Sequence, residues 1–259
     1  MKKYVEELFA YRELLANLVV NELRLRYRNS VLGFLWTILN PLVYLAILSI
    51  VFSKIFRFQI ENYTIFLFSG LVCWAMIQQT VSIATASIVA NQGLIRRVYV
   101  PKIVFPLSNV LARYIDHVIL TVILLGAMVV FRMPFTWSLL FLPVAVLLNF
   151  VFSLGLSLIT TTAHIRIRDV EHVVSIGFQI LFYITPILYT VDVLPPKFRN
   201  VLLLNPVYYF IEAFRYPVAY GTFPPGWVLW RAGLIAVATF AAGLFIFSRK
   251  EKYFVYQLS

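Results

Sequence analysis

The chain has 259 residues, of which 61% are hydrophobic and 13% are charged, and its net charge is +11. A soluble domain carries about 25% charged residues, so this composition excludes one soluble core and indicates that lipid surrounds much of the chain. The basic residues flank long apolar runs, which is typical of membrane topology signals rather than of nucleic-acid binding. The sequence therefore predicts an all-α integral membrane protein.

Residues 1–30 are predicted to form an amphipathic helix at the membrane interface. Basic residues gather at both ends of this segment, as in helices that lie in the head-group plane. A helix packed on a protein partner would show the same pattern and stays the alternative. Apolar side chains recur at helical spacing along one stripe, at Tyr4, Leu8, Tyr11, Leu15 and Leu18.

Six apolar runs follow. Each has at least 19 residues, enough for a helix to cross roughly 30 Å of hydrocarbon. Pro186 near the end of the fifth run predicts a kink or an end of that helix. We expect one transmembrane domain over 31–252 and a short cytoplasmic tail over 253–259. The predicted spans are 31–56, 63–90, 107–131, 137–163, 173–191 and 228–248.

The segment 192–227 is too long for a turn and too apolar for a solvated loop. We expect two short helices that dip into the membrane and return, because irregular backbone at that depth is tolerated where protein or water covers it. Two helices lying on the outer surface are the alternative. The prolines that divide the segment stand at Pro195-Pro196, Asn205-Pro206, Pro217 and Pro224-Pro225.

The distribution of bases predicts the orientation. The N-terminal segment, the loops 91–106 and 164–172, and the C-terminal tail fall on one side of the predicted bundle and carry most of the lysine and arginine. By the positive-inside rule, both termini of this multi-pass protein are expected in the cytoplasm.

Motifs for catalysis or nucleotide binding do not occur in the sequence. No glycine is followed by lysine, so there is no P-loop. His117, His164 and His172 lack partners at metal-ligand spacing, and the single cysteine, Cys73, is expected to be a small buried side chain. We expect no catalytic, cofactor or metal site in this chain. Arg113 and Asp116, three residues apart on a helix, are expected to pair.

Deeply placed aromatic residues are candidates for a glycan pathway. Aromatic faces can stack on the apolar faces of sugar rings, and stacking between aromatic rings is worth about 0.5–1.5 kcal/mol. A weak, repeated contact suits a sliding polymer. Ordinary packing in a helix bundle is the alternative for each of them. The candidates are Phe34, Trp36, Tyr44, Phe178, Phe182 and Tyr183.

Five stretches occur in one order along nearly the whole chain. They are Arg26 to Trp36 with Asn40-Pro41-Leu42, Arg96 to Pro101 with Pro106, Arg168 to His172, Tyr183 to Tyr189, and Asn205-Pro206 with Glu212 and Arg215. In this order they resemble the permease subunits of type-2 ABC exporters, in particular those for lipid-linked polysaccharides such as O antigen, capsule and teichoic acid.

The resemblance implies partners and a location. Two permeases would pair, and two separate ABC ATPase subunits, of the kind called Wzt in O-antigen systems, would bind ATP and Mg. An undecaprenyl-linked glycan would pass outward between the permeases across a bacterial inner membrane. An exporter of drugs or lipids, a membrane enzyme acting on lipid-linked sugars, and a non-transporting structural subunit stay as alternatives.

The resemblance also implies roles for particular residues. Glu212 and Arg215 would pair to hold a helix at the exit. Ordinary positive-inside charge is the alternative for Arg96 and Arg97, and a local charge pair is the alternative for the contact made by Arg166, Arg168 and Asp169. The residues implied to couple the permease to the ATPase are Leu94, Ile95, Arg96, Arg97, Val98, Tyr99, Arg166, Arg168 and Asp169.

Overall fold

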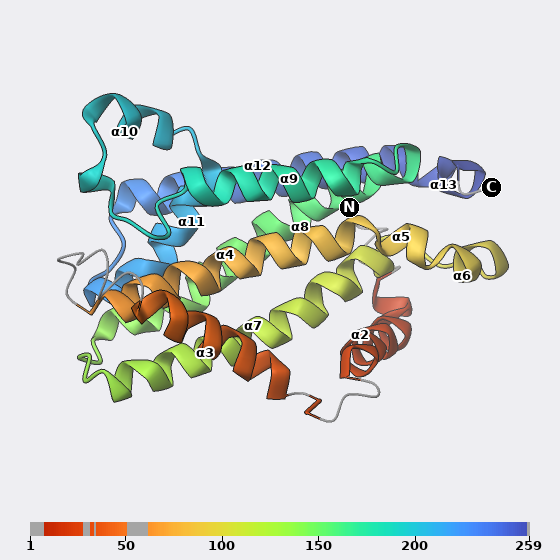
Figure 1. Cartoon of the computed structure of the whole chain (residues 1–259). Coiled ribbons are helices and arrows are strands. Elements are labelled where there is room, and N and C mark those ends of the chain that lie inside the picture. The colour runs from red at the N-terminus through yellow and green to blue at the C-terminus, as the bar shows by residue number, and fades with distance from the viewer. Residues whose placement is uncertain (1–7, 28–31, 34, 51–61, 258–259) are drawn as a thin grey trace.

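A computed structural model describes residues 8–27, 32–33, 35–50 and 62–257, and within these ranges the chain is helical without β-strands (Figure 1). The elements are α2 (Arg12–Tyr27), α3 (Leu35–Ile50), α4 (Tyr63–Thr85), α5 (Ser87–Ala90), α6 (Gln92–Arg97), α7 (Val104–Val130), η2 (Trp137–Phe141), α8 (Leu142–Arg166), α9 (Val170–Ile184), η3 (Val191–Val193), α10 (Pro196–Leu202), α11 (Pro206–Arg215), the π-helical turn η4 (Tyr216–Tyr220), α12 (Gly226–Lys250), η5 (Glu251–Tyr253) and α13 (Phe254–Gln257).

Four of the helical segments are long and apolar enough to cross a membrane. They are Tyr63–Thr85, Val104–Val130, Trp137–Arg166 and Gly226–Tyr253, and they correspond to the second, third, fourth and sixth predicted spans. The first predicted span, 31–56, contains α3, and its residues 51–56 lie outside the described ranges.

The helix in the fifth predicted span ends before the end of that span. Helix α9 ends at Ile184, and Thr185 takes an extended conformation with φ −79° and ψ 134°. Thr185 precedes Pro186, and the proline ring disfavours helical geometry in the residue before it. The predicted end of this helix near Pro186 is therefore confirmed, while the extent of the span up to 191 stays a prediction.

Helices α8 and α12 pack along their lengths through small residues. A methyl group on Gly155 would lie 2.5 Å from the Cα and backbone nitrogen of Phe240, and one on Gly243 would collide with the carbonyl oxygen of Gly155. Close backbone approach at small residues is the usual way in which helices associate in lipid, where apolar area gives no drive for association. These two glycines therefore set the distance between α8 and α12.

Helix α11 lies inside the bundle, while α10 lies on its surface. Every residue from Val207 to Arg215 is buried, and α11 contacts α4, α8 and α12. Pro206 occupies the first turn, where its missing N–H removes no hydrogen bond. The Asn205 side chain accepts a hydrogen bond from the Val207 amide at 3.0 Å and donates one to the Thr185 hydroxyl at 2.7 Å, so the cap also joins α11 to the end of α9.

A buried polar network joins α4, α7 and α8. The Tyr114 hydroxyl donates to the Asn149 side-chain oxygen at 2.7 Å, and the Asn149 amide donates to the Cys73 sulfur at 3.2 Å. Cys73 is buried, as predicted. On α7, Arg113 lies 4.0 Å from Asp116, which confirms the predicted pairing.

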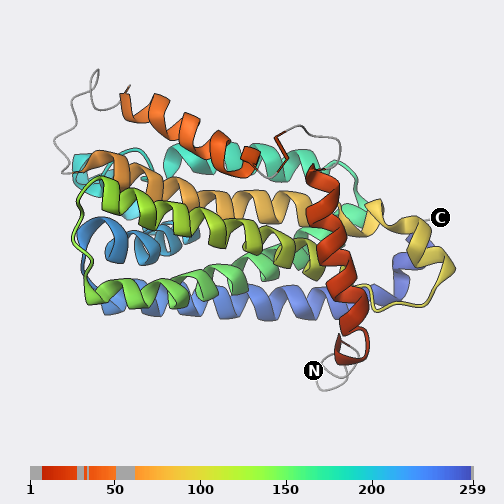
Figure 2. The same cartoon turned by 90° about the horizontal axis from the view of Figure 1, so that it is seen from below.

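The predicted basic segments lie at the same end of the bundle. Helices α2, α6 and α13 and the turn between α8 and α9 lie there, whereas α10 and the turn between α7 and η2 lie at the opposite end (Figures 1 and 2). Figure 2 shows α2 crosswise to the other helices. The apolar side chains of Leu8 and Tyr11, just before α2, and of Leu14, Leu15 and Leu18 within it pack against the core, so this stripe faces protein.

Candidate functional site

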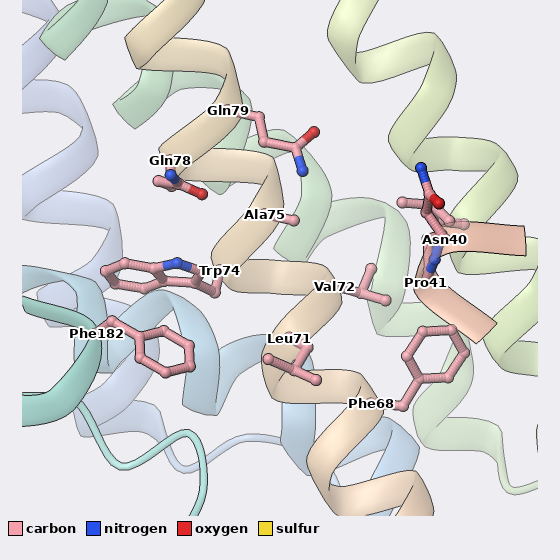
Figure 3. Close-up of a pocket in the computed structure, with 11 residues that line it drawn as sticks. Asn40, Pro41, Phe68, Leu71, Val72, Trp74, Ala75, Gln78, Gln79 and Phe182 are labelled. Atoms are coloured by element: carbon pink, nitrogen blue, oxygen red, sulfur yellow. The ribbon is translucent and has the colours of Figure 1, made fainter. Parts of the chain in front are cut away.

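A cleft lies along the face of α4, between α3 and α9. It comprises a cavity of about 450 Å³ bordered by all three helices and an adjoining cavity of about 380 Å³ between α4 and α9. Trp74, Gln78 and Phe182 border both cavities. Figure 3 shows Trp74 and Phe182 on one side of α4 and Asn40 and Pro41 of α3 on the other. We call this the α4 cleft.

One wall of the α4 cleft is aromatic. The Trp74 ring meets the Phe178 and Phe182 rings edge-on, with centroids 5.8 Å and 5.5 Å apart. Tyr183 packs against Phe182 at 5.5 Å and leaves 68% of its surface exposed. Because Trp74 braces the α9 rings from α4, the rings present a fixed apolar surface to the cavity.

Carboxamides supply most of the polar groups in the α4 cleft. Gln78 and Gln79 are consecutive on α4, and Gln179 lies on α9 between the two phenylalanines. Figure 3 shows Gln78 on the Trp74 side of α4 and Gln79 on the Asn40 side. A carboxamide offers two donors and one acceptor, so these side chains match the mixed donor and acceptor pattern of a sugar hydroxyl.

The predicted pathway aromatics divide into three groups. Phe178, Phe182 and Tyr183 line the α4 cleft. Trp36 lies on α3 and is 46% exposed without lining it. Phe34 and the side chain of Tyr44 lie outside the described residues.

Trp74 and the three glutamines were not among the residues predicted from the sequence. Two signals in the sequence could have found them. Trp74 and Gln78 are four residues apart, as are Phe178 and Phe182, so each pair shares a helix face. Adjacent glutamines within an apolar span are themselves unusual, because an amide left without a partner in hydrocarbon is costly.

The first segment predicted to couple the permease to the ATPase runs from Leu94 to Tyr99. Helix α6, which contains its first residues, projects from the end of the bundle that carries α2 and α13 (Figure 1). Ile95 is buried and Leu94 is half-buried, so they anchor α6 to the bundle. The side chains that stay exposed are Arg96, Arg97, Val98 and Tyr99.

Two hydrogen bonds hold the chain that follows α6. The Tyr11 hydroxyl donates to the Tyr99 carbonyl at 3.4 Å, and the Lys102 amide donates to the Glu251 carboxylate at 2.8 Å. This segment is therefore tied both to the N-terminal region and to the C-terminal end of α12.

The second predicted coupling segment is the turn between α8 and α9. Arg166, Arg168 and Asp169 are exposed there. Beside them, the His164 Nε2 atom lies 4.0 Å from the Glu171 carboxylate. This turn and α6 face the same end of the bundle, so one partner surface is able to reach both; their coupling role stays a prediction.

Glu212 and Arg215 form a buried ion pair at 2.9 Å. The Arg215 Nη1 atom also donates to the Pro186 carbonyl at 2.9 Å, and Nη2 donates to the Ile187 carbonyl at 3.2 Å. The guanidinium carbon lies 3.9 Å from the Phe66 ring centroid. Arg215 thus joins α11 to α4 and to the segment directly after α9, and its role at an exit stays a prediction.

Comparison with known proteins finds relatives that match most of the chain. The chain is 34% identical over 204 residues to the O-antigen export system permease protein RfbA of Klebsiella pneumoniae, covering 78% of this chain and 79% of that one. It is 32% identical over 257 residues to the RfbA protein of Myxococcus xanthus, covering 98% of both chains. It is 26% identical over 251 residues to the polysialic acid transport protein KpsM of Escherichia coli, covering 91% and 92%.

The family model described as ABC-2 type transporter matches residues 13–218, which include the α4 cleft, α6 and the Glu212–Arg215 pair. A match over most of the chain, together with relatives above 30% identity, shows descent from one ancestor. The chain therefore belongs to the ABC-2 type transporter membrane family.

Proposed function

We propose that this chain is the permease subunit of an ATP-driven exporter that moves lipid-linked polysaccharide outward across the inner membrane of a bacterium. The observation that carries the proposal is the α4 cleft, in which aromatic faces and carboxamides lie side by side along a membrane-crossing helix. The names of the relatives, which are permeases for O antigen and for polysialic acid, support the same function.

In this proposal the chain crosses the membrane six times, with both termini in the cytoplasm. Helix α3 with the residues after it forms the first crossing, and α9 with the extended segment after it forms the fifth. Helix α2 lies at the cytoplasmic interface. Helix α11 re-enters from the outer side, and its burial among α4, α8 and α12 supports this, since protein rather than lipid surrounds it.

The proposed exporter contains a second copy of the chain and two ABC ATPase subunits that bind ATP and Mg. In this proposal one copy supplies only part of the pathway, because the α4 cleft is partly open rather than an enclosed cavity. On α9, the apolar side chains of Val173, Ile176 and Ile180 are 66%, 57% and 56% exposed. Their spacing places them on one stripe, which supports a contact with the second copy or with lipid.

Depletion of this chain in its native cell tests the proposed function. We expect lipid-linked glycan to build up at the cytoplasmic face and surface glycan to fall, measured by labelling intact and permeabilised cells with a glycan-specific lectin. Re-expression of the wild-type chain is the control. Unchanged surface glycan together with retention of a drug or another lipid would contradict the proposal and favour an exporter of such compounds.

Reversing two charges tests the coupling segment. We expect Arg96→Glu with Arg97→Glu to lower co-purification of the ATPase at least tenfold, because the new carboxylates would repel any acidic groups of the ATPase that the arginines contact, and a like-charge contact across an interface costs several kcal/mol. Export should fall in parallel, as measured by surface glycan.

The matched control is Arg249→Glu with Lys250→Glu, which makes the same charge change in the last turn of α12 at the same end of the bundle. If the two double variants have equal effects, the α6 arginines act only as positive-inside charges that orient the chain in the membrane. Normal assembly and export in the α6 variant would show that they have no coupling role.

A further inference from the structure

The lining of the α4 cleft is uncharged. Among the described residues that border its two cavities, the polar side chains are amides and hydroxyls, and none is a lysine, arginine, aspartate or glutamate. The helices that form the cleft are also almost free of charged residues along their whole length. Helices α3 and α4 contain no charged residue, and α9 has only Glu171, in its first turn.

Cations on neighbouring helices are engaged elsewhere. Arg215 of α11 is 1% exposed and pairs with Glu212. Arg113 of α7 pairs with Asp116. Among the described residues that line the cleft, an acidic sugar would therefore lose water without meeting an opposite charge, and removing a carboxylate from water without a partner is among the costliest steps in protein energetics.

The amides of the cleft are available to a ligand. Within the part of the chain that the structure describes, the side chains of Gln78, Gln79 and Gln179 form no hydrogen bond with another described residue. Each is able to donate to and accept from hydroxyl groups. The aromatic wall beside them offers apolar ring faces of the kind that pack against the C–H faces of sugars.

We infer that the α4 cleft selects for a neutral glycan over a polyanionic one, with Gln78 and Gln179 as specificity-determining residues. The inference rests on the proposed function and adds the chemical class of the polymer. Uncharged hexose units satisfy the amides and the aromatic wall together, whereas uronic or other acidic sugars bring a charge that this lining does not compensate.

Two glycans on one lipid carrier test the inference. Cells that carry the permease and its own ATPase would be supplied with an undecaprenyl-linked polymer of neutral hexoses, or with a polymer of equal length that has one hexuronic acid in each repeat. Surface labelling of intact cells measures export. We expect the neutral polymer to be exported at least tenfold faster, which corresponds to about 1.4 kcal/mol.

The outcomes separate the inference from the proposed function. Equal export of both polymers would overturn the preference for neutral glycans and leave the exporter function standing. Faster export of the acidic polymer would overturn the preference as well. Export of neither polymer, with permease and ATPase present at normal levels, would overturn the proposed function.

Replacing Gln78 and Gln179 by cationic residues tests whether these two side chains determine the specificity. We expect Gln78→Arg with Gln179→Arg to raise the ratio of acidic to neutral export about tenfold, or 1.4 kcal/mol. Gln257→Arg, the same change at an exposed position of α13, should leave the ratio unaltered. An unchanged ratio in the double variant at normal abundance would remove these glutamines as specificity determinants.

A second double variant tests the same two residues in case the arginine variant fails to fold. Gln78→Ala with Gln179→Ala adds no charge and shortens both side chains. We expect this variant to lower export of the neutral polymer severalfold while export of the acidic polymer stays at its low level. Unchanged export of the neutral polymer would overturn the role of the two amides.

Discussion

Arg215→Met is expected to lower the free energy of unfolding by about 3–5 kcal/mol, the usual loss when one partner of a buried ion pair is removed. The substitution leaves the Glu212 carboxylate buried without its cation and removes the donors that serve the Pro186 and Ile187 carbonyls. Equilibrium unfolding of the purified protein in mixed micelles measures the change. Arg97→Met, at an exposed arginine of α6, is the matched control and should have little effect.

A double-mutant cycle isolates the pair itself. We expect Glu212→Gln with Arg215→Met to lose less than the sum of the two single losses, because the double variant no longer buries an unpaired carboxylate. Additivity within about 0.5 kcal/mol would show that Glu212 and Arg215 are not coupled. Arg215 would then act only through the carbonyls after α9.

Gly155→Ala is expected to lower the free energy of unfolding by about 1–3 kcal/mol, the range for overpacking a well-packed core. The added methyl group would lie 2.5 Å from backbone atoms of Phe240. Backbone yields less readily than a side chain, so α8 and α12 would have to move apart. Loss of activity at 37 °C and a lower midpoint of thermal unfolding provide the measurements.

The matched control for this substitution lies on α12 itself. A methyl group on Gly233 would meet no atom within 4 Å, so Gly233→Ala should leave stability unchanged or raise it slightly, since alanine restricts the unfolded chain. Equal effects at Gly155 and Gly233 would show that helix propensity rather than the α8–α12 contact governs both positions.

Predictions from local sequence patterns were confirmed for features that depend only on burial in lipid or on backbone geometry. Four long apolar runs became helices of spanning length, because a segment in hydrocarbon must satisfy its own backbone hydrogen bonds. The prolines at 186, 195–196, 206 and 224–225 all stand at or beside helix ends. At these positions the proline ring restricts its neighbour through the backbone alone, so the effect needs no tertiary context.

Predictions about contacts were less complete. Phe178 and Phe182 were expected on a pathway and line the α4 cleft, but Trp74 and the glutamines beside them were missed. The sequence also predicted two short helices between the fifth and sixth spans but did not distinguish their environments: α11 is buried, and α10 lies on the surface. An apolar side chain looks the same in sequence whether it faces lipid or protein, so periodicity alone does not separate the two environments.

The amino-acid sequence by itself determined the helical class, the positions of the long spans, the proline-defined breaks and the gathering of bases at one end. Each of these follows from the chain's own backbone and from its transfer into lipid. The tertiary structure alone decided that Gly155 faces Phe240, that Arg215 reaches carbonyls 28 and 29 residues away in the chain, and that amides and aromatic rings meet beside α4. Such contacts depend on how whole helices pack, and short-range helical periodicity does not encode that packing.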